Sequence, residues 1–230
     1  MTPTLLALLL SAPAAANGNP SLGQSHDQLA RRGGVVSQGV GLQAAIRIPT
    51  TNNISVSGIP SGATVGHAWP SVVEIVDSTS TYDTAFTLAG NAVTGSLIGT
   101  GQDTCWSRAG DVTIRADVTS IVTGNGTCAL AGVGLSGVER QGSSIVVVST
   151  YPASISPSQV VFRDGALSGK HTGQVISTTL SGFTIPTGVT SASFPIGMGD
   201  SRSYGNGAVT VDGGTVLATD SFTGPPRRGG

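Results

Sequence analysis

Short runs of apolar or alternating residues recur along the chain from Val35 onward, and turn residues separate one run from the next. Examples are NISVSGI, TVGHAWPSVVEIV, TAFTLAG and SSIVVVSTY. Alternation with a period of two is typical of strands that bury one face. About a dozen such strands, with a turn roughly every 8–12 residues, favour two packed sheets. We therefore predict an all-β fold, an antiparallel two-sheet β-sandwich of the jelly-roll or immunoglobulin-like kind.

The composition leaves little material for helices. Glutamate occurs only at Glu74 and Glu139, and lysine only at Lys170, whereas the chain has 34 glycines. Amphipathic helices with charged outer faces need more of both charged types. We expect at most one short helical turn, at Asp117–Val122, with Asp117 as its cap. The unbroken apolar run Ser144–Val148 predicts a central strand buried on both faces.

Four regions follow from the pattern along the chain. Residues 1–16 hold a short apolar run and then small residues, which is typical of a cleaved secretory signal peptide. Residues 17–34 are polar and glycine-rich and predict a flexible N-terminal arm. Residues 35–224 form the predicted β-sandwich domain, and residues 225–230 a C-terminal tail. The mature protein is accordingly expected to be secreted, extracellular or at the cell surface.

The charge balance argues against two classes of partner. Charged residues make up 10% of the chain, and the formal net charge is −1. No basic face is available to neutralise phosphates, so nucleic acid is not an expected partner. No stretch after the leader approaches the length of a transmembrane helix, so no membrane span is expected.

The two cysteines, Cys105 and Cys128, are an even count in a chain with an export signal. In an oxidising compartment such a pair favours a disulfide. We therefore predict a structural disulfide between them.

A few side chains are candidates for binding. His67 and Trp69 would lie on the same face of a strand, where imidazole and indole can contact a glycan, although such a pair also suits core packing. Trp106 and Tyr204 are further candidate ligand-binding residues. Oxygens of Asp200, Asn206 and Asp212 could hold a hard cation such as calcium, although polar turn residues commonly bond their own backbone.

The sequence does not predict an enzyme, and no catalytic residues or cofactor are assigned. The segment GLSG at 134–137 departs from the G-x-S-x-G pattern of a nucleophile elbow, and His26 and His171 lie in loop-like sequence. A catalytic set spread along the chain stays open, because such residues need not be close in sequence.

Several segments together resemble a family of bacterial exported β-sandwich domains of unknown function, found in cell-surface and adhesin-like proteins. They are GIPSGATVGHAWPSVVEI, GQDTCW, IRADVTSIVTGNGTCAL, SSIVVVSTYP, VVFRDGAL and GMGDSRSYGNGAVTVDGG. The likeness spans residues 60–224, and its strongest part is RADVT-x-x-V-x-GNGT. The strand with Trp69 lacks the further aromatic residues of that family. The resemblance implies a β-sandwich, export and no known catalysis.

Three functions remain as hypotheses. The first is a secreted or cell-surface structural or adhesive module, a subunit of an extracellular assembly, that self-associates or binds other surface proteins by strand addition. The second is a secreted carbohydrate-binding module with a glycan ligand, and the third is a secreted hydrolase. Aromatic residues are only 4% of the chain, which favours the first over the second.

Overall fold

The computed structural model describes residues 4–6, 23–31, 33–45, 48–49, 51–103, 107–131, 135–151, 158–167, 176–179, 184, 187, 208–211 and 214–217. Within these residues every regular element is a β-strand, and no helix occurs. The strands are β1 (Thr4–Leu6), β2 (Gly23–Arg31), β3 (Gly33–Gly41), β4 (Gln43–Ala45), β5 (Ile48–Pro49), β6 (Thr51–Val56), β7 (Thr64–Val76), β8 (Ala85–Leu88), β9 (Asn91–Thr94), β10 (Ser96–Gly101), β11 (Gly110–Arg115), β12 (Gly126–Ala131), β13 (Val138–Thr150), β14 (Ser158–Asp164), β15 (Val209–Val211) and β16 (Gly214–Leu217).

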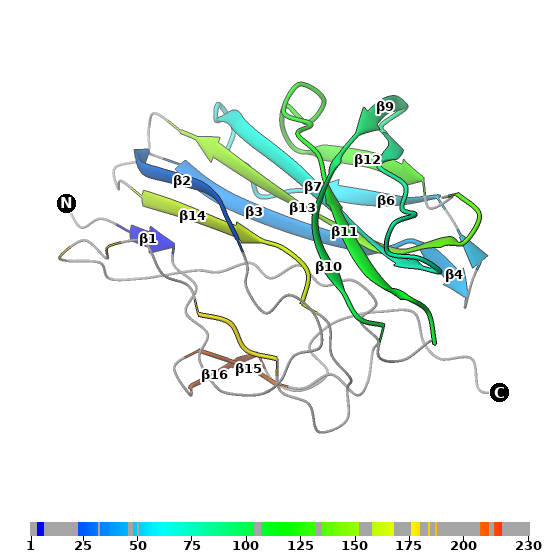
Figure 1. The fold of residues 1–230 in the computed structure, drawn as a ribbon. Helices are drawn as coiled ribbons and strands as arrows, with labels where there is room; N and C mark the ends of the chain where they lie inside the picture. Colours follow the sequence, from blue (N-terminus) through cyan, green and yellow to red (C-terminus); the bar gives the residue numbers. More distant parts are fainter. Residues whose placement is uncertain are drawn as a thin grey trace.

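The larger sheet has five antiparallel strands in the order β10-β11-β7-β13-β3. Its long strands β7, β13 and β3 run side by side through the molecule (Figure 1). The valine run of β13 lies between β7 and β3, and both Val147 and Val148 are buried on opposite faces. The predicted central strand at Ser144–Val148 is thereby confirmed.

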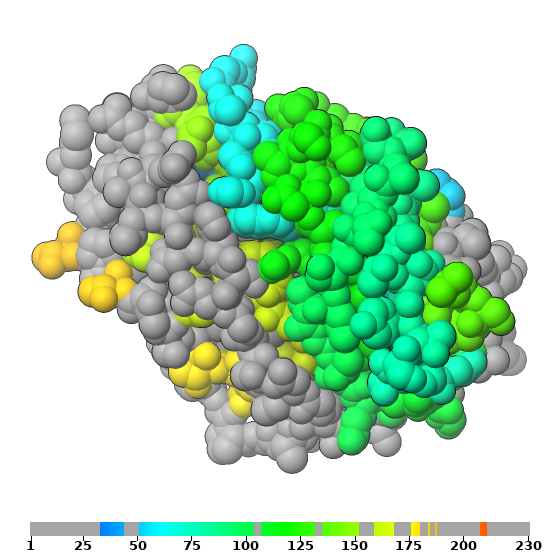
Figure 2. All heavy atoms as spheres, turned by 45° about the horizontal axis from the view of Figure 1, so that its top comes forward, coloured from blue at the N-terminus to red at the C-terminus, as the bar shows by residue number. Residues whose placement is uncertain are grey.

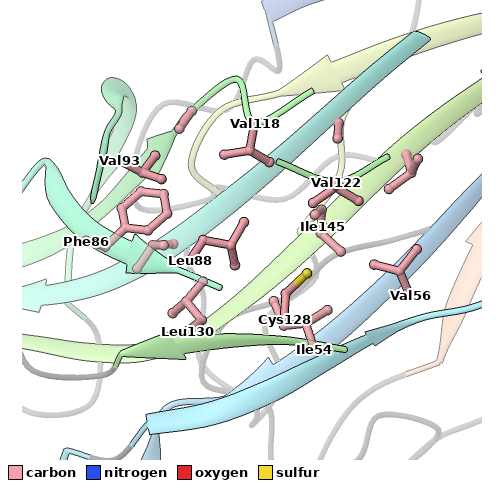
Figure 3. Close-up of a cluster of buried hydrophobic side chains, with 14 of the residues drawn as sticks. Ile54, Val56, Phe86, Leu88, Val93, Val118, Val122, Cys128, Leu130 and Ile145 are labelled. Carbon is pink, nitrogen blue, oxygen red and sulfur yellow. The ribbon is translucent and has the colours of Figure 1, made fainter. Parts of the chain in front are cut away.

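The smaller sheet has four antiparallel strands in the order β6-β12-β8-β9 and packs on one face of the larger sheet. Burial alternates along its strands, so that Ile54, Leu88 and Leu130 point inward while their neighbours face outward. These side chains form one cluster with Val72 and Ile145 of the larger sheet, and Figure 3 shows Ile145 together with them. Each fully buried side chain of this size contributes about 1.5–3 kcal/mol of hydrophobic stabilisation. The two sheets are not closed into a barrel, and the predicted all-β two-sheet sandwich is confirmed.

A third group of strands covers the outer face of the five-stranded sheet. β14 pairs with β2 and, in parallel, with β1. Val160 and Phe162 of β14 pack with Trp69, Val148 and Val35 of the larger sheet. This second apolar contact explains why β13 carries no polar alternation, since both of its faces are covered.

One hydrogen-bonded turn occupies the segment predicted to be helical. The N–H of Val122 donates to the carbonyl of Val118 at 2.9 Å, and the N–H of Thr119 donates to the carboxylate of Asp117 at 2.9 Å. Asp117 therefore caps this turn as predicted, by accepting a bond from an otherwise unpartnered N–H.

The predicted flexible arm needs correction. Residues 23–31 form β2, which pairs with β14, and β3 begins at Gly33 rather than at residue 35. Polar strands are easily misread as linkers, because the tertiary pairing that supplies their backbone hydrogen bonds leaves no local signal. Thr4–Leu6 of the predicted signal peptide form β1, so cleavage after residue 16 would leave β14 and β2 as the outer strands. The rest of the predicted arm, the other residues of the predicted signal peptide and the tail at 225–230 lie outside the described residues.

Candidate interaction edge

The two sheets share one continuous border strand. β9 is the last strand of the four-stranded sheet, β10 is the last strand of the five-stranded sheet, and only Gly95 lies between them. The N–H of Gly95 donates to the carbonyl of Thr84 at 2.8 Å, which fixes the crossing point. We call residues 91–101 the open edge. Among the described residues, β9 has β8 as its sole strand partner and β10 has β11.

The open edge lacks two of the features that usually keep a sheet border from pairing, namely charged residues and proline. Its sequence, NAVTGSLIGTG, has no charged residue and no proline. Natural proteins commonly protect such borders with lysine, proline, short strands or bulges. β9 is short, and β10 has a register shift between Leu97 and Gly99, but among the described residues no strand covers the outer border of either. Most of its side chains are exposed, and Leu97 is 36% exposed.

The opposite border of the sandwich is arranged differently. There β3 and β6, the border strands of the two sheets, lie against one another. The side-chain amide of Asn52 donates to the carbonyl of Gly41 at 3.1 Å and links the two strands. Strand addition is therefore less favourable at this border than at residues 91–101.

Figure 2 shows residues of β8, β9 and β10, coloured teal to green, on the surface at one side of the molecule. On the outer face of the five-stranded sheet, β10 contacts the residues that directly follow β14. A methyl group at Gly99 would meet the backbone of Gly165 and Ala166. β10 is thus packed on its outer sheet face, while Ser96 and Leu97 are exposed and residues 98–100 are half-buried.

Gly95 is required where the border strand changes sheets. A Cβ built there would lie 2.6 Å from Cγ2 of Ile114 and 2.7 Å from the carbonyl oxygen of Arg115. We expect Gly95→Ala to destabilise the protein by about 1–3 kcal/mol, measured by urea unfolding. Gly126→Ala is the matched control, because a Cβ at that strand position meets nothing within 4 Å. Equal effects of the two substitutions would contradict this role of Gly95.

A buried charged cluster joins the two sheets inside the sandwich. Glu74 of β7 and Arg140 of β13 have side-chain exposures of 0% and 1%. Nε of Arg140 donates to Oε1 of Glu74 at 3.1 Å, and its Nη2 lies 2.9 Å from Oδ2 of Asp83. The guanidinium also donates to the carbonyls of Ala85 in β8 and Ala131 in β12. Arg140 therefore links the five-stranded sheet to the four-stranded sheet.

The carboxyl of Glu74 is surrounded by protein rather than water. Burial raises its pKa above the ordinary value, and the hydrogen bonds from the Asp83 N–H and from Arg140 offset this only in part. The native state therefore holds the Glu74 proton to higher pH than the unfolded state does.

This raised pKa sets the direction of a pH effect. As pH rises from the unfolded pKa through the higher folded pKa, the unfolded state binds fewer protons than the native state, so stability falls. We expect wild type to lose stability relative to Glu74→Gln over that window, since glutamine does not titrate. Urea unfolding of both proteins between pH 4 and pH 8 measures the difference, and parallel curves would contradict the expectation.

The structure places His67 and Trp69 together, as predicted, but in a packed arrangement. Trp69 is 9% exposed and stacks on His67 and Phe162, with ring centroids 4.7 and 5.2 Å away. Its indole N–H donates to Asp117. These contacts leave Trp69 no free face for a sugar, so the candidate ligand-binding role of Trp69 is corrected to one in packing.

Asp117 is held in its ionised form at this cluster. Burial alone would raise the pKa of Asp117, but hydrogen bonds from the Thr119 hydroxyl and N–H, with the nearby His67 and Trp69, lower it. The group therefore positions the turn and the aromatic stack.

The other predicted site residues fall outside the described residues. They are Cys105, Trp106, Asp200, Tyr204, Asn206 and Asp212. Among the residues that the structure describes, no group of three histidine, cysteine, aspartate or glutamate side chains could hold a metal ion. The predicted calcium and glycan sites on these residues stay predictions.

The predicted disulfide is not seen. Cys128 is a free thiol buried in the core beside Ile54 and Leu130 (Figure 3). Its predicted partner, Cys105, lies outside the described residues, in the segment between Asp103 and Arg108. The N–H of Arg108 donates to Asp103 at 2.5 Å, and its guanidinium pairs with Asp77. Asp77 follows the last residue of β7, so this flank lies at one end of the larger sheet.

Burial also raises the pKa of the Cys128 thiol, which keeps it neutral and unreactive. With no reductant present, we expect maleimide to label Cys128 in the unfolded protein but not in the folded protein, as measured by intact mass. Absence of label until a reductant is added would show that Cys128 forms a disulfide.

No family model matches this chain, and neither a curated protein nor a solved structure matches it. In the described part of the chain no helix is long and apolar enough to cross a membrane. A function is therefore inferred from the chain's own residues.

Proposed function

We propose that this chain is a secreted or cell-surface structural module that joins a neighbouring protein by strand addition at the open edge. The observation that carries the proposal is the uncharged, proline-free border at residues 91–101. An added strand bonds to the free N–H and C=O groups of such a border, and alternate side chains supply specificity.

Features of the sequence support export and assembly. Residues 1–16 have the pattern of a cleaved leader, and low net charge limits repulsion between packed neighbours. The likeness to exported surface domains points in the same direction. A glycan-binding role is less well supported, since Trp69 is buried in the contact between β7 and β14.

Fractionation of a bacterial host that expresses the full chain tests this function. We expect the protein outside the cytoplasm, with a mass that shows removal of residues 1–16, and retained at the cell surface. Ser96→Lys/Thr100→Lys should release it into the medium, because lysines on the open edge disfavour strand addition.

Thr127→Lys/Ala129→Lys is the matched control, since these exposed positions lie on β12, which has a strand on each side. It should be retained like wild type. Cytoplasmic protein with an intact leader, or equal retention of all three forms, would overturn the proposal.

A further inference from the structure

We infer that the partner at the open edge is a second copy of this chain, paired β10 to β10 in antiparallel orientation about a two-fold axis. This rests on the proposed function and names its partner. The result would be one continuous sheet that joins the five-stranded sheets of two molecules.

The border of β10 offers backbone groups for this pairing on both sides of the register shift between Leu97 and Gly99. One of its borders is occupied by β11, and the other has no strand partner among the described residues. Two identical borders turned antiparallel offer each other matching N–H and C=O groups, which is how a two-fold axis closes an assembly without leaving a further free border.

The side chains of the edge are compatible with their own copies. Residues 91–101 carry no charge, so identical segments meet without the like-charge repulsion that directly opposed charged pairs would cause. Leu97, 36% exposed, aligns with the fully buried Ile114 of β11. Because aligned residues share a face, Leu97 lies on the core side of the sheet, and a neighbouring strand would cover its exposed part.

Sedimentation equilibrium of the exported wild-type protein tests the inference. We expect a reversible monomer–dimer equilibrium, because a single six-residue strand pair forms a small interface. Ser96→Lys/Thr100→Lys should weaken dimerisation at least about tenfold, since lysines on a border strand disfavour strand addition. Thr127→Lys/Ala129→Lys should dimerise like wild type, and unchanged melting temperatures establish that both variants are folded.

Cysteine cross-linking gives the orientation. In an antiparallel pair with its axis between Ile98 and Gly99, Leu97 of one copy lies opposite Thr100 of the other, and both align with core-side residues of β11. A mixture of Leu97→Cys and Thr100→Cys proteins should therefore form a mixed disulfide dimer more readily than either protein alone. Dimers of each variant with itself would overturn the antiparallel arrangement. A wild-type protein that is monomeric at all concentrations but retained at the cell surface through the edge would overturn the second copy while leaving the proposed function intact.

Discussion

Arg140→Ala is expected to destabilise the protein by about 3–5 kcal/mol. The substitution removes the only cation of the buried cluster and leaves the carboxylates of Glu74 and Asp83 facing each other without it. It also strips the carbonyls of Ala85 and Ala131 of a donor. Thermal and urea unfolding measure the effect.

A double variant separates the ion pair from packing. Glu74→Leu/Arg140→Met removes the charges of Glu74 and Arg140 and fills the same space, so it should recover most of the loss, as buried pairs replaced by apolar groups commonly do. A loss below about 1 kcal/mol for Arg140→Ala alone would show that water reaches the cluster and that it does not join the sheets as described.

Trp69→Ala is expected to cost about 3–5 kcal/mol for a different reason. Trp69 is the largest side chain between the five-stranded sheet and β14, and it contacts both His67 and Phe162. Its removal leaves a cavity under β14, while the main core between the two sheets is untouched.

Hydrogen exchange should locate that loss. We expect amides of β14 and of its partner β2 to exchange faster in Trp69→Ala, while those of β12 keep their protection. Trp69→Phe, which retains an aromatic ring but not the N–H bonded to Asp117, should lose less. Uniformly faster amide exchange across both sheets would contradict the conclusion that β14 and β2 form a layer whose stability depends on Trp69.

The strands were predictable because their signal is local. Alternation in TAFTLAG and the valine run at Ser144–Val148 each encode how many faces a strand buries, and the structure agrees. The capped turn at Asp117 was predictable in the same way, since the cap and the bonded N–H are two residues apart.

The interaction edge and the buried cluster depend on which strands become neighbours, and that is not encoded locally. Residues 91–101 read as two ordinary strands until the sheet order leaves them at the border. A charge inside the apolar run SVVEIV does indicate a buried partner for Glu74, but Arg140 lies 66 residues away. Separation along the chain also explains why Trp69 is a candidate ligand-binding residue from sequence alone. The side chains that bury it belong to β14, far along the chain.

The passage of one strand from sheet to sheet at Gly95 has a mechanical consequence. A molecule attached along residues 91–101 pulls on β8 in one sheet and β11 in the other at the same time. Tension parallel to these strands loads the hydrogen bonds of both ladders together in shear, so they resist as a set instead of opening one after another. A border built in this way suits a link that carries force between neighbouring molecules.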